Sequence, residues 1–272
     1  MWKKVNALGE PKRSKVAMEV IREDGSATND PKVVINKWYE DISRLFSGVR
    51  DNPELAFDDN FYKEVCEAKR CFENLSMHEQ ADSTPLDITE LNKDLSFQEV
   101  SVAVNKAKDG KAYMEIPNEA LKRPLAMKLL HNFFNMCFQH GLSPTDWDFS
   151  NIIPIPKKDK DQRDPLNNRC ITIMCCIAKI YSSVITARIQ TFIEKNDLLA
   201  DEQNGFRANR SCIDHIFSLV TILRNRKAQG KATFICFIDY KKAFDSVDRN
   251  LLLFKLSKIG IVGKVYNAIR SL

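Results

Sequence analysis

The sequence lacks the features that mark secreted, membrane-spanning and zinc-binding proteins. No apolar run approaches the roughly 18 residues of a membrane span, and the N-terminal stretch MWKKVNALGEPKR has no apolar signal core. The eight cysteines form no CxxC pair and have no histidine nearby at zinc-ligand spacing. We therefore predict an intracellular chain, nuclear or cytoplasmic, with reduced and partly buried cysteines, no membrane contact and no small-molecule cofactor.

Length and charge allow a folded protein that meets a polyanion. The 272 residues are 44% apolar, which is enough to bury a core in one or two domains. Residues 1–150 hold 20 Lys and Arg against 25 Asp and Glu, whereas residues 151–272 hold 21 against 11. A basic C-terminal half is expected of a nucleic-acid-binding region, and a solvated lysine-rich surface has the same composition. Both interpretations stay open on charge alone.

The first 95 residues mix charged stretches with short amphipathic pieces. Val34, Trp38, Ile42 and Phe46 recur four residues apart, which predicts a helix over residues 33–46. The following residues 52–89 are acidic and weakly periodic, a pattern typical of a linker with short helices.

Helical signals become sharper after residue 95. Ser96 followed by Glu99 forms a capping box and predicts a helix as far as residue 107, which Asp109-Gly110 ends. A second helix is predicted over residues 118–140, with Gly141 as its C-terminal cap. Two further helices are predicted over residues 176–194 and 211–229.

Two strands are predicted on either side of the charged string PKKDKD. Apolar residues cluster in residues 147–155 and again in residues 169–173, and the string between them predicts a loop. Arg169 lies inside the second apolar run. A buried arginine needs an anionic partner, so Arg169 is a candidate for an anion contact.

Asp239 ends a run of apolar residues that favour β structure, Phe234 to Ile238. This pattern predicts a strand with a carboxylate at its end. Phosphoryl transfer to a 3′-hydroxyl uses two divalent cations about 4 Å apart that carboxylates hold. Asp239 is suited to supply one such carboxylate, whereas we expect Asp245 to cap a helix or form a salt bridge and expect Asp248 to point elsewhere.

Three strings in order carry a resemblance to a known family. IPIPKKDKD with NNRCITI, QNGFR with a downstream Arg-Ser, and FIDYKKAFD resemble blocks of reverse transcriptases from retrotransposons without long terminal repeats, of the jockey and long-interspersed-element type. The resemblance covers residues 96–272 and reaches residues 1–95 only weakly. It implies an α+β chain: a helical connector over residues 1–95, then the fingers and an incomplete palm of a right-hand polymerase over residues 96–272.

The resemblance also implies roles for individual residues. Asp239 would be the catalytic residue and metal ligand, and Phe244 would lie under the nucleotide sugar, where its ring would exclude a 2′-hydroxyl. Lys157 or Lys158 and Arg169 would hold the triphosphate, which suits their charges and donors. The template contacts would be Gln203, Gly205, Phe206, Arg207 and Arg210. An exposed turn around Lys157, a plain turn at Gly205 and a core position for Phe244 are the alternatives.

The chain departs from the family pattern at three places. The string GKAYMEIP stands where the family has GKAPGxDGIP, so a glycine and an aspartate are missing. Cys170 follows Arg169 where the family has glycine or proline. No YxDD string, the source of the remaining metal-binding carboxylates, occurs in the 272 residues.

We therefore predict a partial RNA-directed DNA polymerase of a mobile element that is inactive by itself. Mg²⁺ would bind only if the missing block were supplied, and the partners would be an RNA template, a DNA primer and dNTPs. One alternative is a non-catalytic nucleic-acid-binding remnant. Another is a non-functional gene fragment of low stability, in which the strand before Asp239 has an unpaired edge that invites aggregation.

Overall fold

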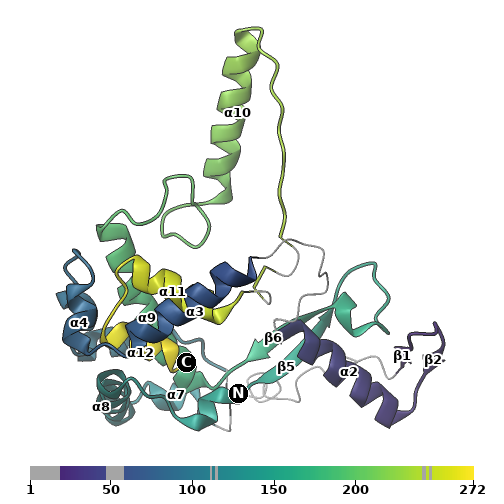
Figure 1. The fold of residues 1–272 in the computed structure, drawn as a ribbon. Helices are drawn as coiled ribbons and strands as arrows, with labels where there is room; N and C mark the ends of the chain where they lie inside the picture. The colour runs from purple at the N-terminus through teal and green to yellow at the C-terminus, as the bar shows by residue number, and fades with distance from the viewer. Residues whose placement is uncertain (1–18, 47–57, 111, 114–115, 241–242, 245–246) are drawn as a thin grey trace, which may run out of the picture. The chain divides into compact units, whose positions relative to one another are not determined.

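The computed structural model describes residues 19–46, 58–110, 112–113, 116–240, 243–244 and 247–272 (Figure 1). The chain divides into two compact units. The first unit comprises residues 1–185 and 244–272, and the second comprises residues 186–243. The described residues are mainly helical and include three two-stranded antiparallel sheets, in agreement with a mixed α and β chain.

The first unit contains most of the helices and strands. In chain order they are β1 (Val20–Ile21), β2 (Ala27–Thr28), α2 (Pro31–Phe46), α3 (Asp59–Glu73), α4 (Met77–Asp82), α5 (Thr89–Asn92), α6 (Phe97–Lys106), β3 (Ala112–Tyr113), β4 (Ile116–Pro117), α7 (Asn118–Leu121), α8 (Pro124–His140), η2 (Thr145–Asp148), β5 (Asn151–Pro156), η3 (Pro165–Asn167), β6 (Asn168–Ile173), the first half of α9 (Cys176–Lys195), α11 (Arg249–Lys258) and α12 (Lys264–Arg270). The second unit holds the rest of α9 and α10 (Cys212–Ala228).

The helix signals of the sequence give helices at the predicted places. Ser96 caps α6, and its capping box with Glu99 is formed. The predicted helix over residues 118–140 is divided into α7 and α8, because a proline at residue 124 cannot continue the preceding helix. Gly141 ends α8 in the left-handed conformation with φ 62°. A Cβ at Gly141 would lie 2.6 Å from the Cβ of Asn267, so α8 and α12 approach closely there.

The core of the first unit is an aromatic cluster around α8 and α9. The ring of Tyr181 lies 5.2 Å from that of Phe134 and 5.5 Å from that of Trp147, and Phe133 packs edge-on against Trp147. Phe134 and Tyr181 are fully buried. Burial, followed by the nearby Cys137, raises the pKa of the Tyr181 hydroxyl. These apolar stripes at helical spacing therefore serve packing, as predicted for residues 176–194.

The N-terminal helices pack against the C-terminal helices α11 and α12. Tyr266 of α12 donates a hydrogen bond to Glu73 at 3.0 Å, and its ring contacts Phe72 of α3. Gln80 of α4 and Asn92 of α5 accept hydrogen bonds from the backbone at the start of α12. Residues 59–92 thus differ from the predicted linker: α3 runs for 15 residues and helps to build the unit. The domain boundary at residue 95 stays a prediction, and these contacts cross it.

The predicted pair of strands is confirmed in β5 and β6. The two strands pair antiparallel over six residues, from Asn151 opposite Ile173 to Pro156 opposite Asn168. The connection between them contains η3, which contacts α2. The charged string at residues 156–161 therefore lies at the end and turn of a hairpin.

The second unit lacks the strand that the sequence predicts. Residues 231–240 have no strand assignment, and Figure 1 shows them as an extended run after α10. Phe234 is 97% exposed and Phe237 is 82% exposed. The prediction of a strand over residues 234–238 is therefore wrong for this structure. A strand needs a hydrogen-bonded neighbour as well as a β-favouring composition, and no other described segment pairs with this one.

Helix α10 also lacks a buried side. Ile213, Ile216, Phe217 and Val220 fall at helical spacing and are all exposed.

Among the described residues, no helix combines the length and apolarity that crossing a membrane would require.

Candidate functional site

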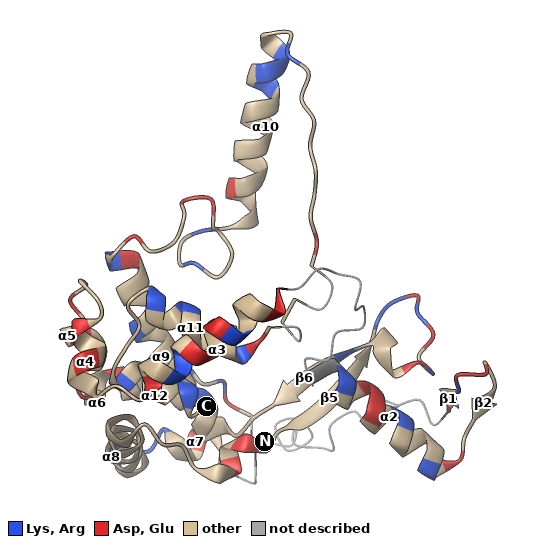
Figure 2. Cartoon of the chain, viewed as in Figure 1, with Lys and Arg blue, Asp and Glu red and all other residues tan. Residues whose placement is uncertain are grey.

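The β5–β6 hairpin carries Lys157, Lys158 and Arg169, for which the resemblance predicts contacts with a triphosphate. The backbone N–H of Lys157 donates to Asn167 at 3.0 Å, and its ammonium donates to the carbonyl oxygen of Leu166 at 2.9 Å. Lys157 therefore helps to close the loop. Lys158 is exposed and forms no ion pair with another described residue. Figure 2 shows that acidic residues accompany Lys and Arg along this connection.

Arg169 does not lie in a buried strand. It is opposite Ile155 in the hairpin, and its side chain is exposed. The interpretation that Arg169 is buried with an obligatory anionic partner is therefore wrong. A sheet of two strands buries little of either face, and Ile155, Ile171 and Ile173 of the same hairpin are exposed as well. Arg169 has no ion pair within the described part of the chain, so its guanidinium is accessible to an anion.

A second cation in the hairpin loop is already neutralised. Arg163 forms a bidentate contact with Asp161, with its Nη2 2.8 Å from Oδ2. The hydrogen bonds from Arg163 lower the pKa of the Asp161 carboxyl to about 2. Sequence reasoning missed this pair, although two opposite charges two residues apart in a turn are a signal for it. The pair leaves Lys158, Lys160 and Arg169 as the unpaired cations described in and beside this loop.

The QNGFR string forms a turn between α9 and α10 in the second unit. Arg207 donates two hydrogen bonds to Glu194 at the end of α9, at 2.9 and 2.7 Å, and one to the carbonyl of Ala200. Its side chain is only 10% exposed. This ion pair lowers the pKa of the Glu194 carboxyl. Arg207 therefore holds the turn onto α9, and its assignment as a template contact stays a prediction.

The other residues of this turn differ in exposure. Phe206 adopts a left-handed conformation with φ 63°, which is unusual for a bulky residue, and its ring is 84% exposed. Gly205 has little room for a side chain, because an added Cβ would lie 3.3 Å from the Gln203 amide nitrogen. Arg210 lies 3.6 Å from Asp201 at the surface. The turn thus presents Phe206 and part of Arg210 outward, while Gln203 donates to the carbonyl of Gly205.

Asp239 lies at the exposed end of the second unit. Its side chain is exposed, and the segment around it forms no sheet with other described residues. Phe244 belongs to the first unit and is 79% exposed, so the alternative of a core position for this ring is wrong. Asp245, which we expected to cap a helix or form a salt bridge, lies outside the described residues, as do Lys111, Met114 and Glu115 of the GKAYMEIP string.

The donors among the described residues do not form a two-metal site. Within the described parts of the chain, no three His, Cys, Asp or Glu side chains gather where they could hold a cation. Two divalent ions need several carboxylates between them, and Asp239 supplies one carboxylate. Asp248 is engaged elsewhere, because its Oδ1 accepts from the backbone N–H groups of Asn250 and Leu251 at the start of α11.

Asp248 also has a partner that sequence reasoning missed. The hydroxyl of Tyr62 on α3 donates to Oδ2 of Asp248 at 3.0 Å. Helix α3 is thereby joined to α11, the helix that follows Asp239 in the sequence. A separation of 186 residues between the two partners gives no local signal from which the contact could be predicted.

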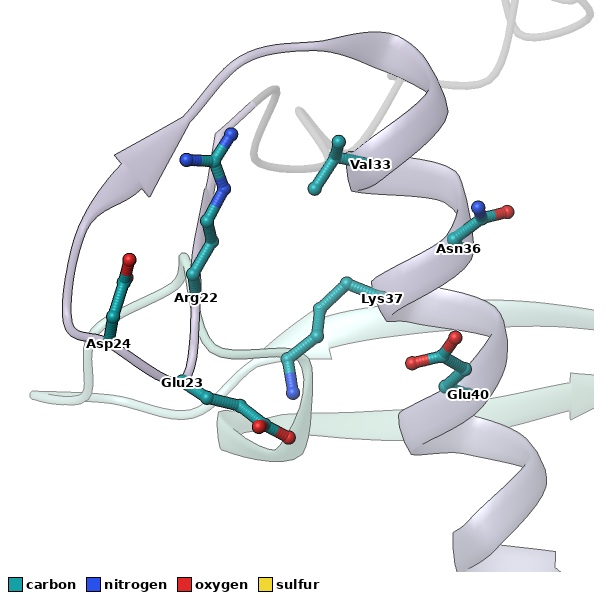
Figure 3. A pocket seen from close by; sticks show the side chains of 7 residues that line it. All are labelled: Arg22, Glu23, Asp24, Val33, Asn36, Lys37 and Glu40. Atoms are coloured by element: carbon teal, nitrogen blue, oxygen red, sulfur yellow. The ribbon is translucent and has the colours of Figure 1, made fainter.

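A surface hollow elsewhere in the first unit contains none of the predicted site residues. It has a volume of about 460 Å³ and lies between α2 and the turn that joins β1 to β2 (Figure 3). Arg22 and Lys37 line it together with Glu23, Asp24 and Glu40. Figure 3 shows the cationic and acidic side chains interspersed around the hollow, so it has no clear preference for an anion.

The C-terminal part of the chain matches a family model. Residues 155–272 match "Reverse transcriptase (RNA-dependent DNA polymerase)", and this stretch includes Lys157, Arg169, the QNGFR turn and Asp239. This part of the chain is thus similar to the reverse transcriptases of mobile elements. The predicted recognition is thereby confirmed for this part of the sequence.

Curated relatives of the chain come from insect mobile elements. It is 24% identical over 180 residues to a probable RNA-directed DNA polymerase from transposon BS of Drosophila melanogaster, which covers 65% of the chain and 20% of the relative. It is 25% identical over 184 residues to the RNA-directed DNA polymerase from mobile element jockey of Drosophila funebris. This alignment covers 65% of the chain and 20% of the relative. It is 28% identical over 134 residues to a retrovirus-related Pol polyprotein from type-1 retrotransposable element R2 of Popillia japonica. This alignment covers 49% of the chain and 18% of the relative.

The matches span only part of each relative. The chain covers about a fifth of the length of these three proteins. The activity, substrates and partners of the whole polymerases are therefore proposals when they are applied to this chain.

Proposed function

We propose that the chain supplies the fingers and the first palm segment of an RNA-directed DNA polymerase and does not synthesise DNA by itself. The observation that carries this proposal is the family match over residues 155–272, the stretch in which all the predicted nucleotide, template and metal residues lie. Lys158 and Arg169 would meet the triphosphate of a dNTP, and Phe206 with Arg210 would meet the RNA template. Asp239 would be one metal ligand among several.

The proposed inactivity rests on the number of carboxylates. The reaction needs two divalent cations, which the family holds with Asp239 and further carboxylates of a YxDD block. The 272 residues contain no YxDD string, and the described residues offer no acidic cluster in its place. The chain would bind Mg²⁺ productively only if these carboxylates were supplied.

A primer-extension assay tests the proposal. The purified 272-residue chain is incubated with an RNA template, an annealed DNA primer, dNTPs and Mg²⁺, and we expect no extension above the background without protein. Extension that needs Mg²⁺ and disappears in the Asp239→Ala variant would refute the proposed inactivity.

A second candidate function is binding of nucleic acid without chemistry. It is favoured by Lys158, Lys160 and Arg169, which are exposed around the hairpin and form no ion pair with another described residue. Unpaired cations release counterions when they meet phosphates, so the affinity would fall with salt concentration and would not require Mg²⁺.

Filter binding to single-stranded RNA across a salt series separates the two functions. We expect the slope of log affinity against log salt to become shallower by about 0.7 in each of Lys158→Ala and Arg169→Ala. Arg163→Ala is the matched control, because Asp161 already neutralises Arg163 in the same loop. If the slope of log affinity against log salt were the same in all three variants, the hairpin would not be part of the RNA-binding surface.

A further inference from the structure

The connection between β5 and β6, residues 157–167, has its own hydrogen bonds and is named the lysine loop below. Lys157 closes its base: the backbone N–H donates to the carbonyl oxygen of Asn167 at 3.0 Å, and the ammonium donates to that of Leu166 at 2.9 Å. Two exposed cations lie near the tip of the loop: Lys158 and Lys160. The two ends of the loop are therefore joined, and these lysines lie between them.

Elements from the N-terminal part of the chain pack against the second half of the lysine loop. Among the described elements, α2 makes its most extensive contacts with η3 and β1, and Figure 1 shows α2 next to the hairpin. Pro165 of η3 and Val20 of β1 are fully buried. The backbone N–H of Ile21 donates to the carbonyl oxygen of Arg163 at 3.4 Å, and the Glu19 carboxylate lies 3.8 Å from the guanidinium of Arg163. Strand β1 and helix α2 thus hold the loop from one side.

Helix α2 has a covered side and an exposed side. Val34, Trp38, Asp41 and Ile42 are buried or half-buried, and they recur at the three- and four-residue spacing of one helix face. Tyr39 points the other way and is 73% exposed. The indole Nε1 of Trp38 is buried and forms no hydrogen bond with another described residue. The ring of Trp38 therefore acts through packing.

We propose that β1 and α2 form a brace that fixes the lysine loop for contact with phosphate groups, with Trp38 as a positioning residue. A flexible loop must become ordered when its side chains bind a ligand, and this ordering costs affinity. A loop that is already packed on one side avoids part of that cost. The inference rests on the proposed function, because the phosphates in question are those of a dNTP or of an RNA strand.

The brace and the accessible cations occupy different parts of the lysine loop. At the braced part, Asp161 already neutralises Arg163, and Glu19 adds a second carboxylate nearby. Near the tip, Lys158 and Lys160 form no ion pair with another described residue. A change in the brace therefore alters how firmly these cations are held without removing any of them.

Amide hydrogen exchange of the intact chain tests the brace without a ligand. We expect Trp38→Ala to speed exchange of the Ile21, Lys157 and Asn167 amides at least about tenfold, while the amides of α8 are unchanged. Tyr39→Ala on the exposed side of α2 is the matched control. Trp38→Phe keeps a buried ring and should exchange almost as slowly as the wild type, since the indole N–H has no described partner.

Three results of the exchange experiment would overturn the proposal. The first is an unchanged rate in the lysine loop of Trp38→Ala. The second is an equal acceleration in Tyr39→Ala. The third is faster exchange throughout α8 in Trp38→Ala, which would mean that the ring supports the whole unit instead of the loop.

Binding measurements test the consequence for phosphate contacts. Single-stranded RNA and inorganic triphosphate are titrated separately into the intact chain. We expect Trp38→Ala to weaken at least one of them about three- to tenfold, and the weakened probe identifies the source of the phosphate. For RNA, the slope of log affinity against log salt should stay the same in Trp38→Ala, because no cation is lost, whereas Lys158→Ala should make it shallower.

The two variants separate failure of the brace from failure of the proposed function. Wild-type affinity of Trp38→Ala for both probes would overturn the brace and leave the proposed function in place. Wild-type affinity of Lys158→Ala for both probes would instead refute the role of the lysine loop in the proposed function, while the exchange result would still decide whether β1 and α2 hold the loop.

Discussion

The two units of the chain have similar local sequence patterns and very different packing. In the first unit, α6, α8 and α12 each bury apolar side chains, and Phe134, Phe138, Tyr181 and Tyr266 are fully buried. In the second unit, α10 is equally helical but buries no residue, and the apolar run after it is exposed. Local signals thus form a helix in both units, whereas burial and strand formation depend on partners that only the first unit has.

The largest expected effect on stability comes from removing the buried aromatic ring of Phe134. Phe134→Ala should lower the free energy of unfolding of the first unit by about 3–5 kcal/mol, because it leaves a cavity beside Tyr181 and Phe133. Phe217→Ala on α10 should change it by less than about 0.5 kcal/mol, because its ring is already exposed. Urea denaturation of both variants measures the difference. Similar losses would mean that α10 is packed after all.

Two glycines give a sharper comparison. Both Gly141 and Gly230 have a positive φ, so alanine costs about 1–2 kcal/mol of backbone strain at either position. At Gly141 the new Cβ would also lie 2.6 Å from Asn267, whereas at Gly230 nothing lies within 4 Å. We expect Gly141→Ala to be more destabilising by at least about 1 kcal/mol. Equal melting temperatures for the two variants would contradict the close contact of α8 with α12.

A helix cap gives a smaller effect. Ser96→Ala removes the acceptor for the Glu99 backbone N–H, and should destabilise the first unit by about 1 kcal/mol. Ser101→Ala lies in the same helix, where its hydroxyl contacts only a carbonyl of the preceding turn, and should be close to neutral. Thermal unfolding of the pair checks this prediction. A neutral Ser96→Ala would show that α6 does not depend on its capping box.

The smallest effect is a pH dependence in the hairpin loop. The pKa of Asp161 is lowered to about 2 from an ordinary 3.8, so its carboxylate favours the folded loop above the ordinary pKa, and this contribution disappears as the pH falls from 3.8 through about 2. NMR titration of Asp161 measures the shift. Arg163→Ala should return the pKa towards 3.8, and an unchanged low pKa would contradict the ion pair.

Much of the fold could be predicted from local pattern alone. The capping box at Ser96, the αL cap at Gly141 and the apolar runs beside PKKDKD each involve residues close in sequence, and each prediction is confirmed. The strand that local pattern predicted before Asp239 is absent, since a strand forms only with a partner that may be distant in sequence. The packing of α3 onto α11 was missed for the same reason, because contacts such as Tyr62 with Asp248 have no local signature.

The candidate site was predictable as a set of residues but not as a geometry. The order of the blocks predicted a resemblance over residues 96–272, and the family match covers residues 155–272 of this stretch. Exposure of Arg169 and the pairing of Arg207 with Glu194 could not be read from the sequence, because both depend on how much neighbouring structure covers each side chain. The roles of the individual site residues remain predictions.

The most direct test of the account is amide hydrogen exchange of the wild-type chain at a concentration low enough to keep it monomeric. The central claim is that the backbone of residues 234–240, which includes Asp239, forms no hydrogen bond with another described residue. We predict that the amides of residues 234–240 exchange at nearly the rate of an unstructured peptide, while those of α8 are protected by several orders of magnitude. Protection of residues 234–240 comparable to that of α8 would mean that the segment is already paired within the chain, and would contradict the account.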